Sequence, residues 1–230
     1  MAMSLNQIVP WGRSLSEYRR MFAMSEADLA GKILGCGDGP ASFNAELTEQ
    51  GGSVVSIDPI YAFTAEQIRQ RVQETRHEIV AKVKLTPQDY LWTEFRDPDD
   101  LGRHRLAVME TFLTDYEAGR MEGRYQCQAL PKLDFADDCF DLALSSHFLF
   151  LYSEQLDADF HCAAIEELCR VAREIRIFPL LDLLCQRSTH VASVIDYATN
   201  LGMQATVEVV PYEFQRGGRE MLRIRTRNRD

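Results

Sequence analysis

The stretch that most constrains this chain is residues 32–40, K-I-L-G-C-G-D-G-P. A short apolar run ends there in glycines at alternate positions, Gly35, Gly37 and Gly39, and a helical pattern begins at Ala41. Glycine tolerates positive φ and has no Cβ, so it suits a tight turn at which a ligand approaches the backbone. The stretch therefore predicts a strand, a glycine loop and the N-terminus of a helix.

Asp58 is the second constraint. It ends the next apolar run, residues 53–57, about twenty residues after the glycine loop, where a doubly wound fold places a carboxylate for ribose hydroxyls. A dinucleotide fingerprint reads G-x-G-x-x-G, whereas here the third glycine comes one residue early and the loop contains Asp38. A carboxylate repels a diphosphate and attracts an ammonium or sulfonium group. The pattern favours a cationic nucleoside; a strand-to-helix turn that binds nothing is the alternative.

These motifs resemble a known family. I-L-G-C-G-D-G-P followed by S-I-D-P is similar to the first two motifs of the class I S-adenosylmethionine-dependent methyltransferases, in particular the type 11-like members, and residues 133–147 resemble the family's passage into its fourth strand. The resemblance implies an α/β fold, with a Rossmann-like doubly wound sheet of seven strands. That sheet is mostly parallel and has a C-terminal antiparallel β-hairpin. The implied cofactor is S-adenosyl-L-methionine.

The resemblance also implies roles for particular residues. The glycine loop would lie against the methionine part of the cofactor, and Asp58 would hold the ribose. Many family members hold the adenine amino group with an acid, but this chain has Gln128 and Ala129 at that place. Backbone amides around Ala129 and Leu130, or the Gln128 amide, would have to substitute. The cofactor-binding residues are therefore expected to be Gly35, Cys36, Gly37, Asp38, Gly39, Asp58, Pro59, Ala129, Leu130 and Ser145.

His147 is the candidate catalytic residue. The resembled family lines its pocket from the loop after the fourth strand, here residues 145–152, and ligands bind at the carboxyl edge of such sheets. A histidine pKa suits proton transfer at neutral pH, although methyl transfer needs positioning more than a base. The alternative is that His147 only orients the loop. Tyr152 is a weaker candidate, and Cys36 is interpreted as a small buried thiol.

The remaining patterns predict one domain over residues 1–230. Its leading helices, within residues 1–31, open at Ser14 and Ser25, and Tyr18, Arg19 and Phe22 could touch the cofactor or pack on the sheet. Residues 62–123 are expected to form a helical insertion that acts as a lid. Its helices start after Thr64, Thr86 and Asp97. The later elements are a helix over 41–50, strands over 124–130 and 174–178, helices from Ser153 and Ser188, and a hairpin over 206–225.

Composition limits the partners and the compartment. The 230 residues carry a net charge of −10, which opposes binding to nucleic acid or anionic membrane and favours small or basic partners. The six cysteines lack C-x-x-C or Cys/His spacing, so no metal site is expected, and they are interpreted as buried thiols in a reducing compartment. With no leader or membrane-length apolar run, we expect a cytoplasmic protein. The arginines of residues 216–229 fit a solvated strand face and tail, or an anionic partner.

The sequence therefore predicts a methyltransferase that acts on a small-molecule acceptor. Two alternatives stay open. One is a non-catalytic module that binds S-adenosylmethionine or S-adenosylhomocysteine, suggested by the missing adenine acid. The other is an NAD-dependent oxidoreductase, which the terminal hairpin disfavours.

Overall fold

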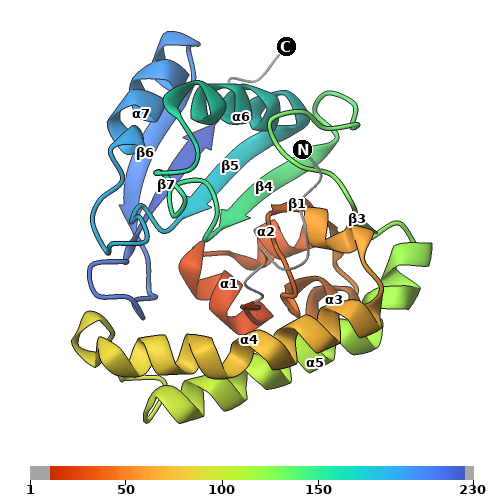
Figure 1. Ribbon diagram of the computed structural model, residues 1–230. Coiled ribbons are helices and arrows are strands. Elements are labelled where there is room, and N and C mark those ends of the chain that lie inside the picture. The colour runs from red at the N-terminus through yellow and green to blue at the C-terminus, as the bar shows by residue number, and fades with distance from the viewer. Residues whose placement is uncertain (1–10, 226–230) are drawn as a thin grey trace.

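A computed structural model describes residues 11–225, which form a sheet of seven strands (Figure 1). The strand order is β3-β2-β1-β4-β5-β7-β6, and β7 runs antiparallel to both of its neighbours while the other adjacent pairs are parallel. The predicted fold class, with its C-terminal antiparallel hairpin, is confirmed. The strands are β1 Lys32–Cys36, β2 Ser53–Ile57, β3 Tyr125–Gln126, β4 Phe140–Ser146, β5 Ala172–Phe178, β6 Gln204–Val209 and β7 Glu220–Arg225.

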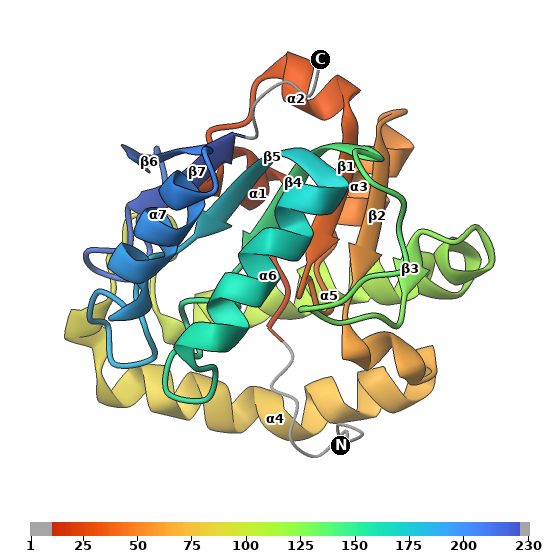
Figure 2. The same cartoon turned by 90° about the horizontal axis from the view of Figure 1, so that it is seen from above.

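Helices cover both faces of the sheet. Figure 2 shows α6 (Ala158–Val171) and α7 (His190–Asn200) on one face, and α1 (Leu15–Met21) and α3 (Phe43–Glu49) on the other, where the short α2 (Glu26–Ala30) leads into β1. Each face has its own apolar core. Leu168 and Val194 pack against the sheet on the first face, and Phe22 and Phe43 do so on the second.

The segment between β2 and β3 forms two long helices, α4 (Ala65–Leu85) and α5 (Pro98–Met121). They pack against each other and build a third apolar cluster, which includes Val72, Phe112 and Tyr116. Figure 2 shows α4 lying across the end of the sheet toward which β1 and β2 point. These helices therefore stand beside the carboxyl edge of the parallel strands.

Local capping signals confirm several predicted helix starts. The side chains of Ser14, Ser25 and Thr64 each accept a hydrogen bond from the backbone N–H three residues on. The acid or amide side chain at that later position accepts a second bond from the backbone N–H of the capping residue. Asp97 likewise caps the helix that begins at Pro98. Thr86-Pro87 opens only a single 3-10 turn, Pro87–Asp89, so the prediction of a full helix there is wrong.

Two other predicted boundaries are wrong for identifiable reasons. The helix expected from Ser153 begins at Ala158 with Asp157 as its N-cap, because the Ser153 hydroxyl bonds instead to the Phe150 carbonyl and the Ser188 hydroxyl. The strand expected over 124–130 is only two residues long. There the Gln128 N–H turns back to the Gln126 carbonyl, which ends the pairing with β2.

Two of the C-terminal arginines are paired within the sheet. Arg223 and Arg225 both bond to Glu174, while residues 227 and 229 lie outside the described chain.

The cysteines differ in exposure. Cys36 and Cys169 are buried but Cys127 is exposed, so the prediction of uniformly buried thiols is wrong. In the described chain, no helix could cross a membrane and no cluster of potential metal ligands was found.

Candidate functional site

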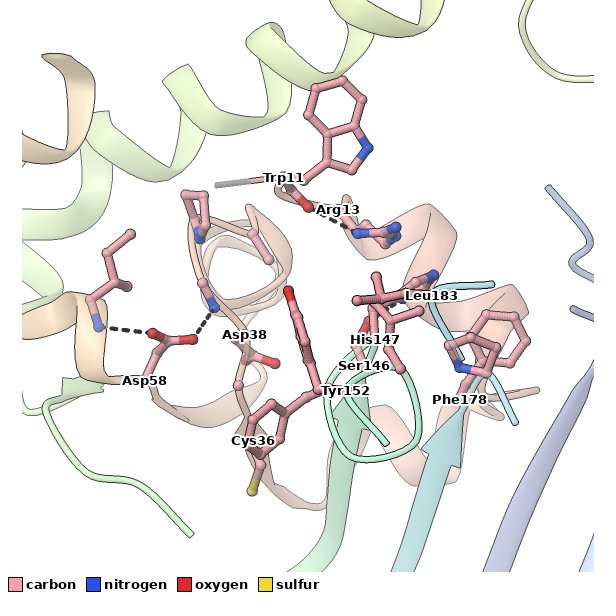
Figure 3. Close-up of a pocket in the computed structure, with 18 of the residues that line it drawn as sticks. Trp11, Arg13, Cys36, Asp38, Asp58, Ser146, His147, Tyr152, Phe178 and Leu183 are labelled. Carbon is pink, nitrogen blue, oxygen red and sulfur yellow. Dashed lines mark hydrogen bonds between the residues drawn. The ribbon is translucent and has the colours of Figure 1, made fainter. Parts of the chain in front are cut away.

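A cavity of about 680 Å³ opens at the carboxyl ends of β1, β2 and β4 (Figure 3). Its size lies in the range of small-molecule sites, about 300–1,000 Å³. The strand order reverses at β1, which has β2 on one side and β4 on the other, and ligands of open α/β sheets bind at such switch points. The glycine loop and Asp58 both line this cavity.

The glycines of the loop serve different purposes. Gly37 has φ +69°, its N–H donates to the Ile57 carbonyl at 2.9 Å, and a Cβ there would lie 2.9 Å from the Phe148 ring. Gly39 has φ +52°, in the left-handed region that favours glycine. A Cβ on Gly35 would lie 1.8 Å from the Asp38 carboxylate, so this position must be small for Asp38 to turn inward.

Asp38 lies beneath the loop and braces it. Its carboxylate accepts hydrogen bonds from the Tyr18 hydroxyl at 2.7 Å and the Ser56 hydroxyl at 2.6 Å, and only 7% of the residue is exposed. Burial, and to a lesser extent the charge of Asp58, raise the pKa of Asp38 to about 6, although both hydrogen bonds favour the ionised form. The loop is thereby tied to α1 and to β2.

Asp58 follows β2 on the same cavity wall. One carboxylate oxygen accepts from the Ile60 N–H at 2.8 Å and the other from the Gly39 N–H at 2.9 Å. Burial raises the pKa of Asp58 to about 6 despite these two bonds. No cationic side chain within residues 11–225 pairs with Asp38 or Asp58. A carboxylate has about four lone-pair sites, so Asp58 can still accept from ligand hydroxyls.

The expected adenine side of the cavity is lined by Gln128, Ala129 and Leu130. The Gln128 amide is partly engaged, because its nitrogen donates to the Gln126 side chain at 2.8 Å and its oxygen accepts from the Asp134 N–H at 2.8 Å. An amide has two N–H donors and two lone pairs on its oxygen, so these bonds leave one of each for a ligand. Both predicted substitutes for the missing acid, the Gln128 amide and the backbone around Ala129 and Leu130, therefore stay predictions.

His147 lines the cavity from the loop after β4 with φ +52°, a conformation that costs a non-glycine residue about 1–2 kcal/mol. Its backbone N–H donates to the Phe178 carbonyl at 2.7 Å, and its ring Nδ1 lies 3.0 Å from the Ser146 hydroxyl. Burial, then the charges of Arg13 and Arg105, hold the pKa of His147 well below its ordinary value. The imidazole is therefore neutral at pH 7, and the lowered pKa makes it a weaker base than a free imidazole.

The structure brings most of the predicted site residues together. Gly35 and Ser145 do not line the cavity: Gly35 faces Asp38, and the buried Ser145 hydroxyl has no partner in the described chain, while the neighbouring Ser146 reaches the cavity wall. The predicted residues that do line it are Cys36, Gly37, Asp38, Gly39, Asp58, Pro59, Ala129, Leu130, His147 and Tyr152. Burial raises the pKa of Cys36 well above its ordinary value, which agrees with an inert thiol.

The leading helix and more distant segments add residues to the site. Tyr18 lines the cavity, whereas Arg19 pairs with Glu26 and Phe22 packs in the core. Sequence reasoning missed Trp11 and Arg13 before α1, and Leu183, Tyr212 and Phe214 from the loops at the far edge of the sheet. None of these belongs to a recognisable motif. Their one shared signal is position, next to strand ends or helix starts.

A curated protein is similar in sequence to this chain over nearly its whole length. The chain is 34% identical over 225 residues to "Uncharacterized protein MJ0045" of Methanocaldococcus jannaschii, and the alignment covers 97% of this chain and 98% of that protein. No protein-family model matches the chain.

Solved structures of methyltransferases are also similar. A TehB-like SAM-dependent methyltransferase from Corynebacterium glutamicum is 16% identical, with 92% of this chain and 87% of that chain covered and a TM-score of 0.49. Magnesium protoporphyrin IX methyltransferase from Synechocystis, solved with bound SAM, is 13% identical, with 88% and 73% covered and a TM-score of 0.45. TM-scores this low leave the strand order as the evidence for the fold.

Proposed function

This chain belongs to the same family as MJ0045 and has the class I methyltransferase fold, and we propose that it binds S-adenosylmethionine and transfers the methyl group to a small-molecule acceptor. The observation that carries the proposal is the pair of carboxylates, the buried Asp38 and the half-buried Asp58, on one cavity wall without a cationic partner in the described chain. Uncompensated negative charge in a cavity favours a positively charged ligand.

The same wall disfavours a dinucleotide. A pyrophosphate at the glycine loop would lie against Asp38, whose charge would repel it. S-adenosylmethionine instead carries a sulfonium, and its ribose hydroxyls are donors that suit Asp58. In this proposal Asp58 holds the ribose, the glycine loop follows the methionine part, and the backbone around Ala129 and Leu130 borders the adenine.

When bound, the cofactor supplies an electrophilic methyl group on sulfur. The acceptor's nucleophilic atom must approach in line and unprotonated, so the chain's main contribution is to position it. We assign to the neutral His147 imidazole the removal of a proton from the acceptor, at the ring nitrogen that does not face Ser146.

The segment of residues 62–123 supplies part of the acceptor pocket in this proposal. Ile79 and Val83 of α4, Tyr90 of the connection and Leu101 of α5 line the cavity opposite the sheet. Together with the N-terminal helices they would act as a lid over a single methyltransferase domain. A covered pocket of this size fits a small molecule better than a macromolecular acceptor.

Calorimetric titration with S-adenosylmethionine, S-adenosylhomocysteine and NAD tests the cofactor. We expect the two adenosyl ligands to bind and NAD not to. Asp58→Ala should weaken S-adenosylmethionine binding about tenfold or more, because a hydrogen bond to a charged group contributes about 1.5–3 kcal/mol. The matched control is Asp196→Ala, which removes an exposed aspartate of α7 and should leave the affinity unchanged. An unchanged affinity in Asp58→Ala, or NAD binding in its place, contradicts the proposal.

Transfer of a labelled methyl group to a metabolite extract tests catalysis. We expect turnover by the wild type, and a loss of about a hundredfold in His147→Asn with S-adenosylmethionine affinity within about twofold. Asparagine tolerates the positive φ at this position, so the loop should keep its shape. If the protein binds S-adenosylmethionine tightly but methylates no fraction of the metabolite extract, it would instead be the non-catalytic module.

A further inference from the structure

Arg13 is a fixed feature of the cavity that the proposed cofactor site does not use. Its carbonyl accepts from the Ser42 N–H at 3.1 Å, and the preceding Gly12 carbonyl accepts from the Arg105 side chain at 3.1 Å. A Cβ on Gly12 would lie 2.1 Å from the Pro40 carbonyl, so this segment is pressed against the glycine loop. The backbone of Arg13 is therefore fixed beside the cavity, which the residue lines.

The Arg13 guanidinium lacks a counter-ion among residues 11–225. Its Nη1 donates to the Trp11 carbonyl at 2.9 Å, and its buried Nε has no hydrogen-bond partner. Burial and the neighbouring charge of Arg105 lower the pKa of Arg13, which is the direction expected for an uncompensated cation. The free edge, Nε together with Nη2, is the fork that binds a carboxylate through two parallel hydrogen bonds.

The neighbouring acid is already committed elsewhere. Glu17 accepts from Arg105 Nη2 at 2.6 Å and Nη1 at 2.7 Å, and from the Tyr212 hydroxyl at 3.0 Å. Asp38 is held by its two hydroxyl donors. The two arginines and one glutamate of this region therefore leave one positive charge, and that charge belongs to Arg13.

The position of Arg13 indicates which ligand it meets. Figure 3 shows it on the side of the cavity that holds His147, Leu183 and Phe178, with Tyr152 between this side and Asp58. The ribose site proposed at Asp58 lies across the cavity, whereas His147 is the residue assigned to the acceptor.

We propose that Arg13 binds a carboxylate of the methyl acceptor, so that the acceptor is an anion with an apolar or aromatic body. The inference rests on the proposed function, and it reverses the preference for basic partners that the net charge of the chain suggests. Trp11, Phe178, Tyr212 and Phe214 line the same cavity and provide the apolar surface for such a body. Burial is the main cause of the lowered His147 pKa, and a carboxylate at Arg13 would offset the smaller contribution of the Arg13 charge, which makes the imidazole a stronger base when the acceptor is present.

The test uses benzoate and its neutral isostere benzamide as probes. Each is titrated calorimetrically into the full-length protein saturated with S-adenosylhomocysteine, with chloride as the only other anion. We expect benzoate to bind the wild type about tenfold or more tighter than benzamide, because only the carboxylate pairs with the guanidinium. Arg13→Met should remove this difference, and Arg13→Lys should retain part of it. Arg19→Met, which removes a surface arginine of the following helix, is the matched control and should behave as the wild type.

Equal binding of the two probes to the wild type, including no heat from either, overturns the proposal. It is also overturned if Arg13→Met weakens S-adenosylhomocysteine binding about tenfold but leaves 5′-methylthioadenosine binding unchanged. In that case Arg13 would hold the cofactor's own carboxylate, which methylthioadenosine lacks. If the wild type binds no adenosyl ligand, the proposed function fails, and the comparison of benzoate with benzamide in the free protein still decides whether Arg13 is an anion site.

Discussion

Replacing Asp38 by asparagine should stabilise the free protein, and more so at higher pH. The carboxylate is buried and accepts from two hydroxyl groups, Tyr18 and Ser56, each of which can also accept a hydrogen bond. An asparagine side chain of the same shape can therefore keep both contacts if one hydroxyl reverses its role. The substitution removes the charge and retains the packing.

The magnitude follows from the pKa of Asp38, about 6 in the folded protein against an ordinary value of 3.8. Because the folded state binds the proton more tightly than the unfolded state, the stability of the wild type falls as pH rises between these values. At about 1.36 kcal/mol per pH unit, the ionised carboxylate costs at most about 3 kcal/mol at pH 7.5 and about 1 kcal/mol at pH 4.5. Asp38→Asn should recover up to these amounts.

Urea unfolding of wild type and variant from pH 4.5 to pH 8, followed by circular dichroism, measures the difference. The expected signature is a gain in the free energy of unfolding that grows with pH. Asp196→Asn is the control, and as an exposed substitution it should change stability by less than about 0.5 kcal/mol at any pH. A destabilised Asp38→Asn protein at pH 7.5, or a gain that does not vary with pH, would refute this account of the buried charge.

The negative charge of Asp38 should also favour S-adenosylmethionine over S-adenosylhomocysteine. S-adenosylmethionine and S-adenosylhomocysteine differ by the positive sulfonium, so the ratio of their affinities reports the negative charge at Asp38 and Asp58. Two charges about 8 Å apart at an effective dielectric constant of about 40 interact by about 1 kcal/mol. Both acids have a pKa of about 6, so each should raise the relative affinity for S-adenosylmethionine about fourfold between pH 5 and pH 7.5, and the two together about fifteenfold. Asp38→Asn should reduce the rise to about the fourfold contribution of Asp58, and calorimetry at each pH measures it.

Two further substitutions test the framework around the cavity. Gly37→Ala should cost about 1–3 kcal/mol of stability and weaken S-adenosylmethionine binding, because the position has φ +69° and a Cβ would meet the Phe148 ring. Gly123→Ala, at φ +78° with open space around it, should show the backbone cost alone. If Gly37→Ala and Gly123→Ala lower the free energy of unfolding in urea equally, the contact with the Phe148 ring does not contribute. Glu17→Gln should cost about 3–5 kcal/mol of stability, because it leaves the buried Arg105 without its ion-pair partner. A loss below about 1 kcal/mol by the same assay would mean that the pair is not needed for stability.

Features encoded over a few neighbouring residues could be predicted from the sequence. The capping boxes at Ser14 and Thr64, the glycine loop and the acid after β2 each depend on contacts within one turn or one strand-loop-helix unit. The terminal hairpin and the sheet class followed from alternation and the order of elements. The helix start predicted at Ser153 was wrong because the Ser153 hydroxyl bonds to the Phe150 carbonyl and to the hydroxyl of Ser188, which lies 35 residues away. The strand predicted over 124–130 was too long because the Gln128 N–H turns back to the Gln126 carbonyl.

The sequence by itself determined the glycine loop, Asp58 and the class of sheet, because short-range backbone preference and side-chain periodicity specify them. Only the tertiary structure decided that Asp38 turns inward and that Glu17 pairs with Arg105, which lies 88 residues away. Which charge stays unpaired in the cavity depends on which pairs the packing forms elsewhere. Arg13 became visible as a candidate ligand-binding residue only once those pairings were known, since no local pattern records the absence of a partner.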